Sequence, residues 1–467
     1  MNKFFEALAN VFRIPDLRKR VLFTLALLAV YRIGAFIPTP GIDTVKFESF
    51  FDRNAGGFLG YFNLFSGGML RRMTIFALGI TPYITASIIL QLLTVVVPTL
   101  DKLQKEGELG RRKITQWTRY LTVGLAIVQS VGIALALQGS DGNFVVNPGF
   151  GFIALTTLTF TTGTAFIMWL GEQITERGIG NGMSLIIFVG IIVGLPSAIH
   201  SIYTNTFVTR QWNPLQMMLI LVVMVAVVAF IVLVERGERR IPVQYAKRVV
   251  GRRMMGGQST HLPLKVNAGG VIPIIFASSL LALPATLQQW SFVKSSPWLS
   301  NMVGALGGSQ PLYYLSFIVL IVFFCFFYVS IIFNPNEAAD NMRKYGGFIP
   351  GIRPGKNTAE YMDKILSKIT VVGGLYLSLL SIIPQIMISG IKLQHLPFVG
   401  NFIDAHFPRP LLDGLGVTFY FGGTSLLIVV GVAMDTVNQI EAQLIMRHYE
   451  GFTPRAGRIR GRRSSTS

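Results

Sequence analysis

The stretch YYLSFIVLIVFFCFFYVSIIF, residues 313–333, contains 21 residues and no charged side chain. A helix of about 20 apolar residues crosses the hydrocarbon core of a bilayer, so this stretch predicts a transmembrane helix. The 467-residue chain has the same character throughout, with 51% hydrophobic and 13% charged residues and a mean hydropathy of +0.54. This composition indicates a membrane protein rather than a set of water-soluble domains.

Similar apolar stretches recur on both sides of this one, and almost none carries a charge near its middle. We therefore predict an all-α polytopic membrane protein with ten transmembrane helices. The predicted spans are residues 20–38, 74–97, 119–138, 152–171, 183–203, 216–234, 270–289, 313–333, 368–389 and 416–437.

Basic residues predict the orientation of these spans. An even number of spans places both termini on one side of the membrane. Of the 41 lysines and arginines, 32 fall on that side, and nine, including Arg32, Arg71 and Arg72, fall on the other. Cytoplasmic loops carry the excess of Lys and Arg, so both termini are predicted to be cytoplasmic. The net charge of +19 lies mostly on this face, where it either only sets the topology or also meets anionic lipid, nucleic acid or an acidic protein.

The spans divide into two sets of five. Because five is odd, a second half that shares the fold of the first is inserted upside down, as in many transporters. The predicted parts are a cytoplasmic amphipathic N-terminal segment (1–19), an N-terminal half (20–203), an outer hinge loop (204–215), a C-terminal half (216–437) and a basic cytoplasmic tail (438–467).

One apolar segment, residues 58–72, is too short to span and is interrupted by glycines, including Gly67 and Gly68. Irregular backbone at membrane depth is tolerated only where protein or a water-filled cavity surrounds it. The segment therefore predicts a re-entrant half-helix buried in the protein. The alternative is an interfacial helix that lies flat on the outer surface.

The second predicted span carries Ile80 and Ile84 one helical turn apart, with Pro82 between them as a possible kink. Branched aliphatic side chains that line a channel seal it by dewetting, although two isoleucines taken alone are more often packing residues. No Asp, Glu, Lys, Arg or His lies near the centre of any predicted span. This absence disfavours transport driven by ions or protons.

Two predicted cytoplasmic loops, 235–269 and 334–367, are basic. In the first, Ile241 and Val243 recur at the period of a strand and predict a projecting arm like a β-hairpin. In the second, Pro and Gly residues predict a defined, largely non-helical turn over 341–356. Such loops either dock a phosphate backbone or an acidic partner, or serve only to orient the chain.

Catalytic and cofactor motifs fail when tested. Residues 351–357 resemble a phosphate loop, but the glycine spacing is one short and Asn357 replaces the Ser or Thr that holds Mg²⁺. The glycines of 178–182 lack the preceding strand and third glycine of a dinucleotide site. The five histidines lack metal-ligand spacing, and Cys325 is the single cysteine. We expect no enzymatic activity, no cofactor and no metal.

Six motifs resemble the SecY family, the large subunits of the bacterial protein translocation channel. They are FSGG at 65–68, IFALGI at 75–80, GEQITERGIGNG at 171–182, QSTHLPLKVN at 258–267, PGIRPG at 350–355 and FGGTSLLIVV at 421–430. The resemblance implies two inverted five-helix halves around an hourglass pore. It also implies a lateral gate between the second and third spans on one side and the seventh and eighth on the other.

The resemblance further implies which residues act. The constricting pore ring corresponds to Ile80, Ile84, Ile187, Ile275, Leu426 and Ile428. The plug that closes the outer vestibule at rest corresponds to Tyr61, Phe62, Asn63, Leu64, Phe65, Ser66, Gly67, Gly68, Met69 and Leu70. Docking of a motor ATPase or a ribosome is implied for Arg239, Arg240, Lys247, Arg248, Arg252, Arg253, Arg343, Lys344 and Arg353. Arg353 is the contact expected to couple that partner to gating.

The implied partners are SecE and SecG as small membrane subunits, the motor ATPase SecA, a translating ribosome, signal peptides, unfolded preproteins and anionic lipid. The implied location is the bacterial cytoplasmic (inner) membrane. The implied function is passage of unfolded secretory proteins across this membrane and lateral release of transmembrane segments into lipid. From the residues alone, a secondary transporter with inverted repeats and an insertase without a full aqueous path stay open as alternatives. The long outer loop 392–414 and the basic tail depart from the family pattern.

Overall fold

The computed structural model describes residues 14–53, 63, 66–139, 144–208, 214–245, 248–250, 253–255, 259–287, 296, 310–389 and 423–450. The first half contains α2 (Pro15–Gly34), α3 (Thr44–Arg53), α5 (Thr81–Val96), α6 (Pro98–Lys105), α7 (Glu108–Gln138), α8 (Phe150–Arg177), α9 (Gly182–Val193), α10 (Leu195–Tyr203) and a π-helical turn η1 (Thr204–Val208). The second half contains the helices α11 (Pro214–Glu235), α12 (Ile272–Leu287), α15 (Pro311–Ile332), α16 (Pro335–Lys344), α17 (Lys356–Ser389) and α20 (Gly423–Glu450). Its strands are β1 (Glu238–Tyr245), β2 (Arg248–Val250), β3 (Arg253–Met255), β4 (Ser259–Lys265) and β5 (Gly347–Phe348).

Prolines begin several of these helices. Pro82, Pro98, Pro311 and Pro335 occupy the first positions of α5, α6, α15 and α16. A proline is tolerated there because the first helical N–H groups have no partner within the helix. The predicted kink at Pro82 is therefore wrong, since this residue opens α5 instead of bending it.

Each of the ten predicted spans contains a helix, but two of them depart from a continuous rod. Residues 74–80 form turns rather than the start of a helix. Their backbone bonds to the segment after α2, where the Ile75 N–H donates to Ile37 O at 3.0 Å and the Thr39 N–H donates to Met73 O at 2.9 Å. The predicted span 183–203 is divided into α9 and α10.

The described helices differ in their ability to cross a membrane. By length and composition, five are long and apolar enough, and α5 with α6, bent by 99°, is a sixth candidate. Shorter apolar helices lie at Gly182–Ser197, Leu221–Glu235 and Ile272–Leu281. Large apolar side chains point outward on several helices, for example Leu158 and Val225. An apolar exterior of this kind is typical of a lipid-facing surface.

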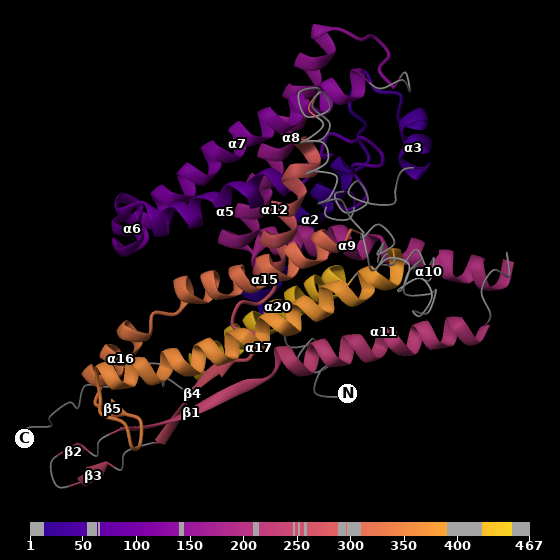
Figure 1. The fold of residues 1–467 in the computed structure, drawn as a ribbon. Helices are drawn as coiled ribbons and strands as arrows, with labels where there is room; N and C mark the ends of the chain where they lie inside the picture. The colour runs from indigo at the N-terminus through magenta and orange to yellow at the C-terminus, as the bar shows by residue number, and fades with distance from the viewer. Residues whose placement is uncertain are drawn as a thin grey trace, which may run out of the picture.

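The helices pack into two groups, which Figure 1 shows one above the other. In the first group α7 and α8 pack together, with α5 against α7 and with α2 and α9 against α8. In the second group α15 packs on α12 and α17, and α20 lies beside α11 and α17. The two groups meet where α5 packs on α12 and where α9 packs on α20.

An antiparallel sheet extends from one end of the second group (Figure 1). Strand β1 pairs along its length with β4, from Glu238 opposite Lys265 to Gln244 opposite Ser259. The shorter strands β2 and β3 pair with each other near the tip. This confirms the predicted hairpin-like arm. In the other loop the predicted non-helical turn is only partly correct, because α16 continues to Lys344.

Helix α3 is held against the segment between α7 and α8 by contacts with Phe144. The Asp43 N–H donates to Phe144 O at 2.8 Å, and the Phe47 and Phe144 rings meet edge to face. Oδ1 of Asp43 accepts the Lys46 N–H at 3.2 Å. This backbone hydrogen bond lowers the pKa of the exposed Asp43 carboxyl. The cap places the first turn of α3 beside residues 71–74.

Candidate functional site

Aliphatic side chains from both groups of helices meet in one buried cluster. It includes all six residues predicted for the ring, none more than 8% exposed: Ile80, Ile84, Ile187, Ile275, Leu426 and Ile428. They come from α5 and its N-cap, α9, α12 and α20. The cluster therefore lies where α5 meets α12 and α9 meets α20, the two contacts that join the groups.

These side chains offer no polar group to a ligand. Branched aliphatic side chains pack without directional preference. Water and ions are disfavoured among these side chains because nothing there replaces their hydration shell. The six side chains therefore form a purely apolar contact between the two groups of helices.

A turn packs against the cluster from the segment predicted to be re-entrant. Met69 belongs to the same buried cluster. Gly67 lies so close to α9 that an added Cβ would stand 2.7 Å from Gly190 Cα, and its φ of +67° lies in the left-handed region. Both features require glycine at this position.

The backbone of this turn is bonded to itself. The side-chain oxygen Oδ1 of Asn63 accepts the Arg71 N–H at 2.9 Å. The backbone carbonyl of Asn63 accepts the Gly68 N–H at 2.8 Å. The Ser66 hydroxyl accepts the Leu70 N–H at 3.2 Å. Ser66 to Leu70 thus form turns, so the predicted half-helix is wrong for these residues. Tyr61, Phe62, Leu64 and Phe65 lie outside the described residues.

The two basic loops come together in one sheet. Strand β5, from the second loop, pairs with the end of β1, with Gln244 opposite Phe348 and Tyr245 opposite Gly347. The resulting strand order is β4-β1-β5. A two-residue strand is too short to be recognised by periodicity, so the sequence gives no signal for this pairing.

Strand β1 combines buried apolar residues with exposed basic ones: Arg239 shares the face of Ile241 and Val243, and Arg240 lies on the opposite face. Ile241 and Val243 are buried, and Ile241 packs in a small core with Leu264, Ile349 and Met362. Arg239 and Arg240 are exposed on β1, and Arg343, Lys344 and Arg353 are exposed on the second loop. The strands of the arm include Arg248 and Arg253, whereas Lys247 and Arg252 lie outside the described residues.

Arg353 stands on a fixed backbone. Its carbonyl accepts the Thr358 hydroxyl at 2.9 Å, and Thr358 is buried in the first turn of α17. Gly351 and Gly355 on either side have positive φ angles of +83° and +105°. The guanidinium therefore projects from an ordered turn between β5 and α17.

Comparison with known proteins identifies this arrangement. The SecY family model matches residues 74–437. The protein translocase subunit SecY of Escherichia coli K12 is 49% identical over 449 residues, which are 95% of each chain. The same subunit of Streptomyces griseus is 48% identical over 459 residues, covering 96% of this chain and 99% of the relative. The chain belongs to the SecY family.

Solved structures agree on the fold of this SecY-family chain. A protein-conducting channel has a TM-score of 0.58 at 17% identity, covering 93% of this chain and 94% of that one. A SecY structure described for its plug domain gives 0.60 at 18% identity with the same coverage. Sec61 in a canine ribosome-channel complex gives 0.54 at 17% identity, also with this coverage.

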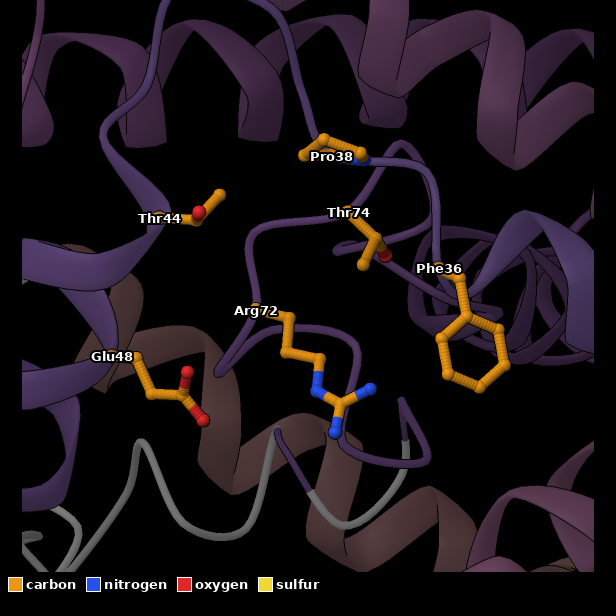
Figure 2. Close-up of a pocket in the computed structure, with 6 residues that line it drawn as sticks. All are labelled: Phe36, Pro38, Thr44, Glu48, Arg72 and Thr74. Atoms are coloured by element: carbon orange, nitrogen blue, oxygen red, sulfur yellow. The ribbon is translucent and has the colours of Figure 1, made fainter.

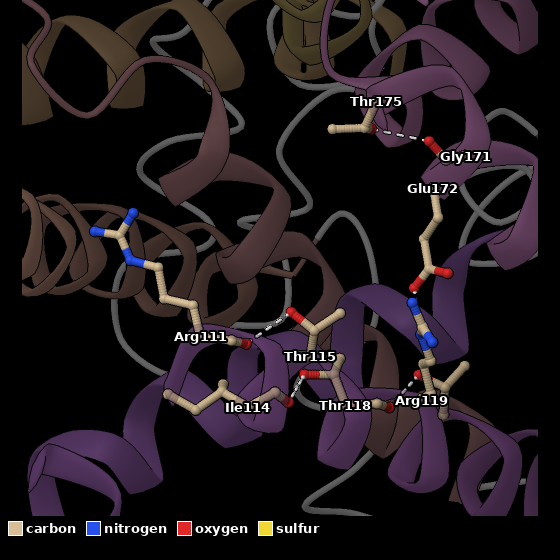
Figure 3. Close-up of polar contacts among 9 residues, drawn as sticks. Arg111, Ile114, Thr115, Thr118, Arg119, Gly171, Glu172 and Thr175 are labelled. Atoms are coloured by element: carbon tan, nitrogen blue, oxygen red, sulfur yellow. Dashed lines mark hydrogen bonds and ion pairs between the residues drawn. The ribbon is translucent and has the colours of Figure 1, made fainter. Parts of the chain in front are cut away.

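Sequence reasoning missed an ion pair between helices of this SecY fold. Nε of Arg119 on α7 lies 2.7 Å from Oε1 of Glu172 on α8. Figure 3 shows this pair beside Thr115 and Thr118, whose hydroxyls donate to carbonyls of their own helix. Both charges lie at ends of predicted spans, but their pairing depends on how α7 and α8 pack.

The glycines of 178–182 have a structural role in the SecY fold. Asn181 Oδ1 accepts the N–H groups of Met183 and Ser184 and so caps α9. The Ile179 N–H donates to the Thr24 hydroxyl on α2 at 3.1 Å. This turn therefore connects α8 and α9 and is bonded to α2. Within the described part of the chain, no group of three or more His, Cys, Asp or Glu side chains could hold a metal ion.

Proposed function

We propose that this chain is the channel-forming subunit of a protein translocase. It passes unfolded secretory proteins across a membrane and releases apolar segments sideways into lipid. The observation that carries the proposal is the buried aliphatic cluster, to which α5, α9, α12 and α20 contribute from both groups of helices. Membership of the SecY family agrees with this function.

The mechanism follows from the apolar character of the cluster. In the resting channel, Ile80, Ile84, Ile187, Ile275, Leu426 and Ile428 form a ring that excludes water. A translocating chain pushes these side chains apart, and they close around it without binding a particular sequence. The pore opens sideways where α5 packs on α12, since this contact joins the two groups of helices.

The turn that includes Gly67 and Met69 acts as the plug. Met69 contacts the aliphatic cluster and Gly67 sits against α9, so the turn covers the cluster from the side of α3. Its bonds are mainly internal, through Asn63 and Ser66. A segment bonded mainly to itself can leave its seat as a unit, which suits a plug that moves when a polypeptide enters.

The sheet β4-β1-β5 and the turn at Arg353 form the docking surface for the motor ATPase SecA or for a translating ribosome. The exposed guanidinium and ammonium groups on this surface suit acidic side chains or phosphates. Solved relatives include Sec61 in a canine ribosome-channel complex and a yeast Ssh1 complex bound to the 80S ribosome. Because β5 pairs with β1, a partner that moves one loop also moves the other.

The chain functions in the bacterial cytoplasmic membrane with ten spans in two inverted halves and both termini in the cytoplasm. SecE and SecG are its membrane partners, and signal peptides and unfolded preproteins are its substrates. Alternate loops carry most of the basic residues, which supports this orientation. The chain acts as a channel rather than as an enzyme, so SecA or the ribosome supplies the energy.

Reconstitution tests the proposal. The purified chain is placed in vesicles with SecE and SecG, and SecA, ATP and an unfolded preprotein are added outside. Accumulation of protease-protected preprotein is expected, and vesicles without the chain are the control. If SecA binds and hydrolyses ATP but the preprotein is no better protected than in the control, the proposal is refuted. A secondary transporter or an insertase would then be the remaining hypotheses.

A further inference from the structure

Two arginines meet around one phenyl ring at the end of α2. The guanidinium carbon of Arg32 lies 5.3 Å from the centroid of the Phe36 ring, and that of Arg72 lies 5.6 Å from it. The ring is 61% exposed. A cation gains energy from an aromatic face, but two cations on one ring repel each other. This arrangement is therefore stabilised when an anion lies between or beside the guanidinium groups.

Neither arginine finds that anion among the described residues. The acid nearest this site, Glu48, is paired with Arg71, whose Nη2 lies 3.1 Å from Oε1 of Glu48. Arg32 donates only weakly to the Gly67 carbonyl, at 3.5 Å. In the described part of the chain, Arg32 and Arg72 form no salt bridge. Arg32, Arg71 and Arg72 are three of only nine basic residues expected on this side of the membrane.

A pocket adjoins Arg72 (Figure 2). Its volume is about 210 Å³, and the residues that line it are Phe36, Pro38, Thr44, Glu48, Arg72 and Thr74. Figure 2 shows the Arg72 guanidinium between the Glu48 carboxylate and the Phe36 ring. Thr74 is only 1% exposed, and its hydroxyl has no hydrogen-bond partner among the described residues. The pocket thus offers the Arg72 cation to a small anionic group, and the Glu48 carboxylate, which is paired with Arg71, also lines it.

The flanking residues place this pocket at the depth of lipid headgroups. Helix α2 ends beside this pocket, and its apolar part, residues 21–31, separates the basic cluster Arg18–Arg20 from Arg32. Arg32 lies in its last turn. Ile33 and Ile37 beside it are 65% and 47% exposed, and Val45 at the start of α3 is 77% exposed. Arginines among exposed apolar side chains at a helix end are typical of the membrane interface.

We propose that Arg32 and Arg72 bind the phosphodiester of a membrane phospholipid, with its headgroup in the pocket between Phe36, Glu48 and Thr74. Paired guanidinium groups recognise phosphate well, because each offers two parallel N–H donors. The bound phosphate ties the end of α2 to the segment that includes Arg72. That the bound lipid belongs to the outer leaflet rests on the proposed topology, but the binding of the phosphate does not.

Native mass spectrometry of the full chain tests this site. The purified chain with its membrane partners is held in a neutral detergent and titrated with phosphatidylglycerol. We expect Arg72→Gln to weaken binding of one lipid about tenfold, since a charge-assisted hydrogen bond contributes about 1.5–3 kcal/mol. The matched control is Lys46→Gln, which removes one charge from the same surface at a 61% exposed side chain. Arg72→Lys should retain part of the affinity.

Two outcomes would overturn the proposal. Equal lipid binding by wild type, Arg72→Gln and Lys46→Gln would show that Arg72 does not hold a lipid. Binding of inorganic phosphate that depends on Arg72, with no Arg72-dependent binding of lipid, would assign the pocket to a free anion instead. The melting temperature of each variant is measured alongside. Because Arg72 is exposed, we expect the melting temperature of its variants to equal that of the wild type. A loss of bound lipid would then not result from unfolding.

Discussion

Replacing Gly67 with alanine tests whether the turn at residues 66–70 seals the channel. A left-handed backbone costs an L-residue about 1–2 kcal/mol relative to glycine. The new Cβ would stand 2.7 Å from Gly190 Cα, a backbone atom that cannot rotate away. Overpacking of this kind costs about 1–3 kcal/mol more. The seated turn should therefore lose about 2–5 kcal/mol relative to a displaced one.

The neighbouring glycine supplies the control. Gly68 has a φ of +83°, but nothing lies within 4 Å of a Cβ added there. Gly68→Ala should thus carry only the backbone strain of about 1–2 kcal/mol. Because about 1.4 kcal/mol corresponds to a factor of ten, the displaced population should rise about five- to thirtyfold in Gly68→Ala. In Gly67→Ala it should rise about thirtyfold or more.

Ion conductance across planar bilayers measures the difference. Each variant is reconstituted with SecE and SecG, and the leak is recorded without SecA or preprotein. The expected order is wild type, then Gly68→Ala, then Gly67→Ala with the largest leak. If Gly67→Ala leaked no more than Gly68→Ala while both ran as intact complexes, contact between the turn and α9 would not form the seal.

Three further predictions address the rest of the site. Ile84→Gly should raise the resting ion leak of the channel, because it opens a gap in the aliphatic cluster. The control Leu158→Gly, at an outward-facing residue, should not raise the leak. Equal leaks in the two variants would show that Ile84 is not part of the ring. Arg353→Glu should reduce SecA-driven export of a preprotein by tenfold or more, because one charge-assisted contact contributes about 1.5–3 kcal/mol. Size-exclusion chromatography should show that the complex still assembles. Export at the wild-type rate would exclude Arg353 from docking. Asn267→Ala should lower the unfolding free energy by about 1–3 kcal/mol, because Asn267 Nδ2 donates to Oε1 of Glu235 at 2.6 Å. Glu235→Gln keeps an acceptor and should be milder in the same thermal unfolding assay, so equal losses in both would contradict this role.

The sequence alone predicted where the helices lie and what class of protein they form. Apolar stretches such as 313–333 correspond to helices such as α15, because a long run of uncharged apolar residues can satisfy its backbone in lipid only as a helix. The strand-period residues Ile241 and Val243 likewise predicted the arm. These are local properties, fixed by composition and periodicity.

Sequence reasoning failed where neighbours in space decide the backbone. Residues 74–80 have the apolar composition of a span, yet they form turns: the Ile75 N–H donates to Ile37 O, and the Ala77 and Gly79 N–H groups donate to Thr74 O and Phe76 O. The turn at 66–70 is likewise set by Asn63 and by the contact with Gly190. Such bonds leave no periodic trace, because their partners are distant or irregularly spaced along the chain.

Hydropathy, charge and sequence motifs therefore determined the class of protein, the approximate positions of the helices and the family. All three signals depend on residues close together in the chain. Only the tertiary structure decided which side chains meet. It brought the six aliphatic residues into one cluster, paired β5 with β1 across two loops, and placed Arg32 and Arg72 on one ring. Each of these depends on the packing of elements far apart in the sequence, and packing is fixed by shape and burial that no local pattern records.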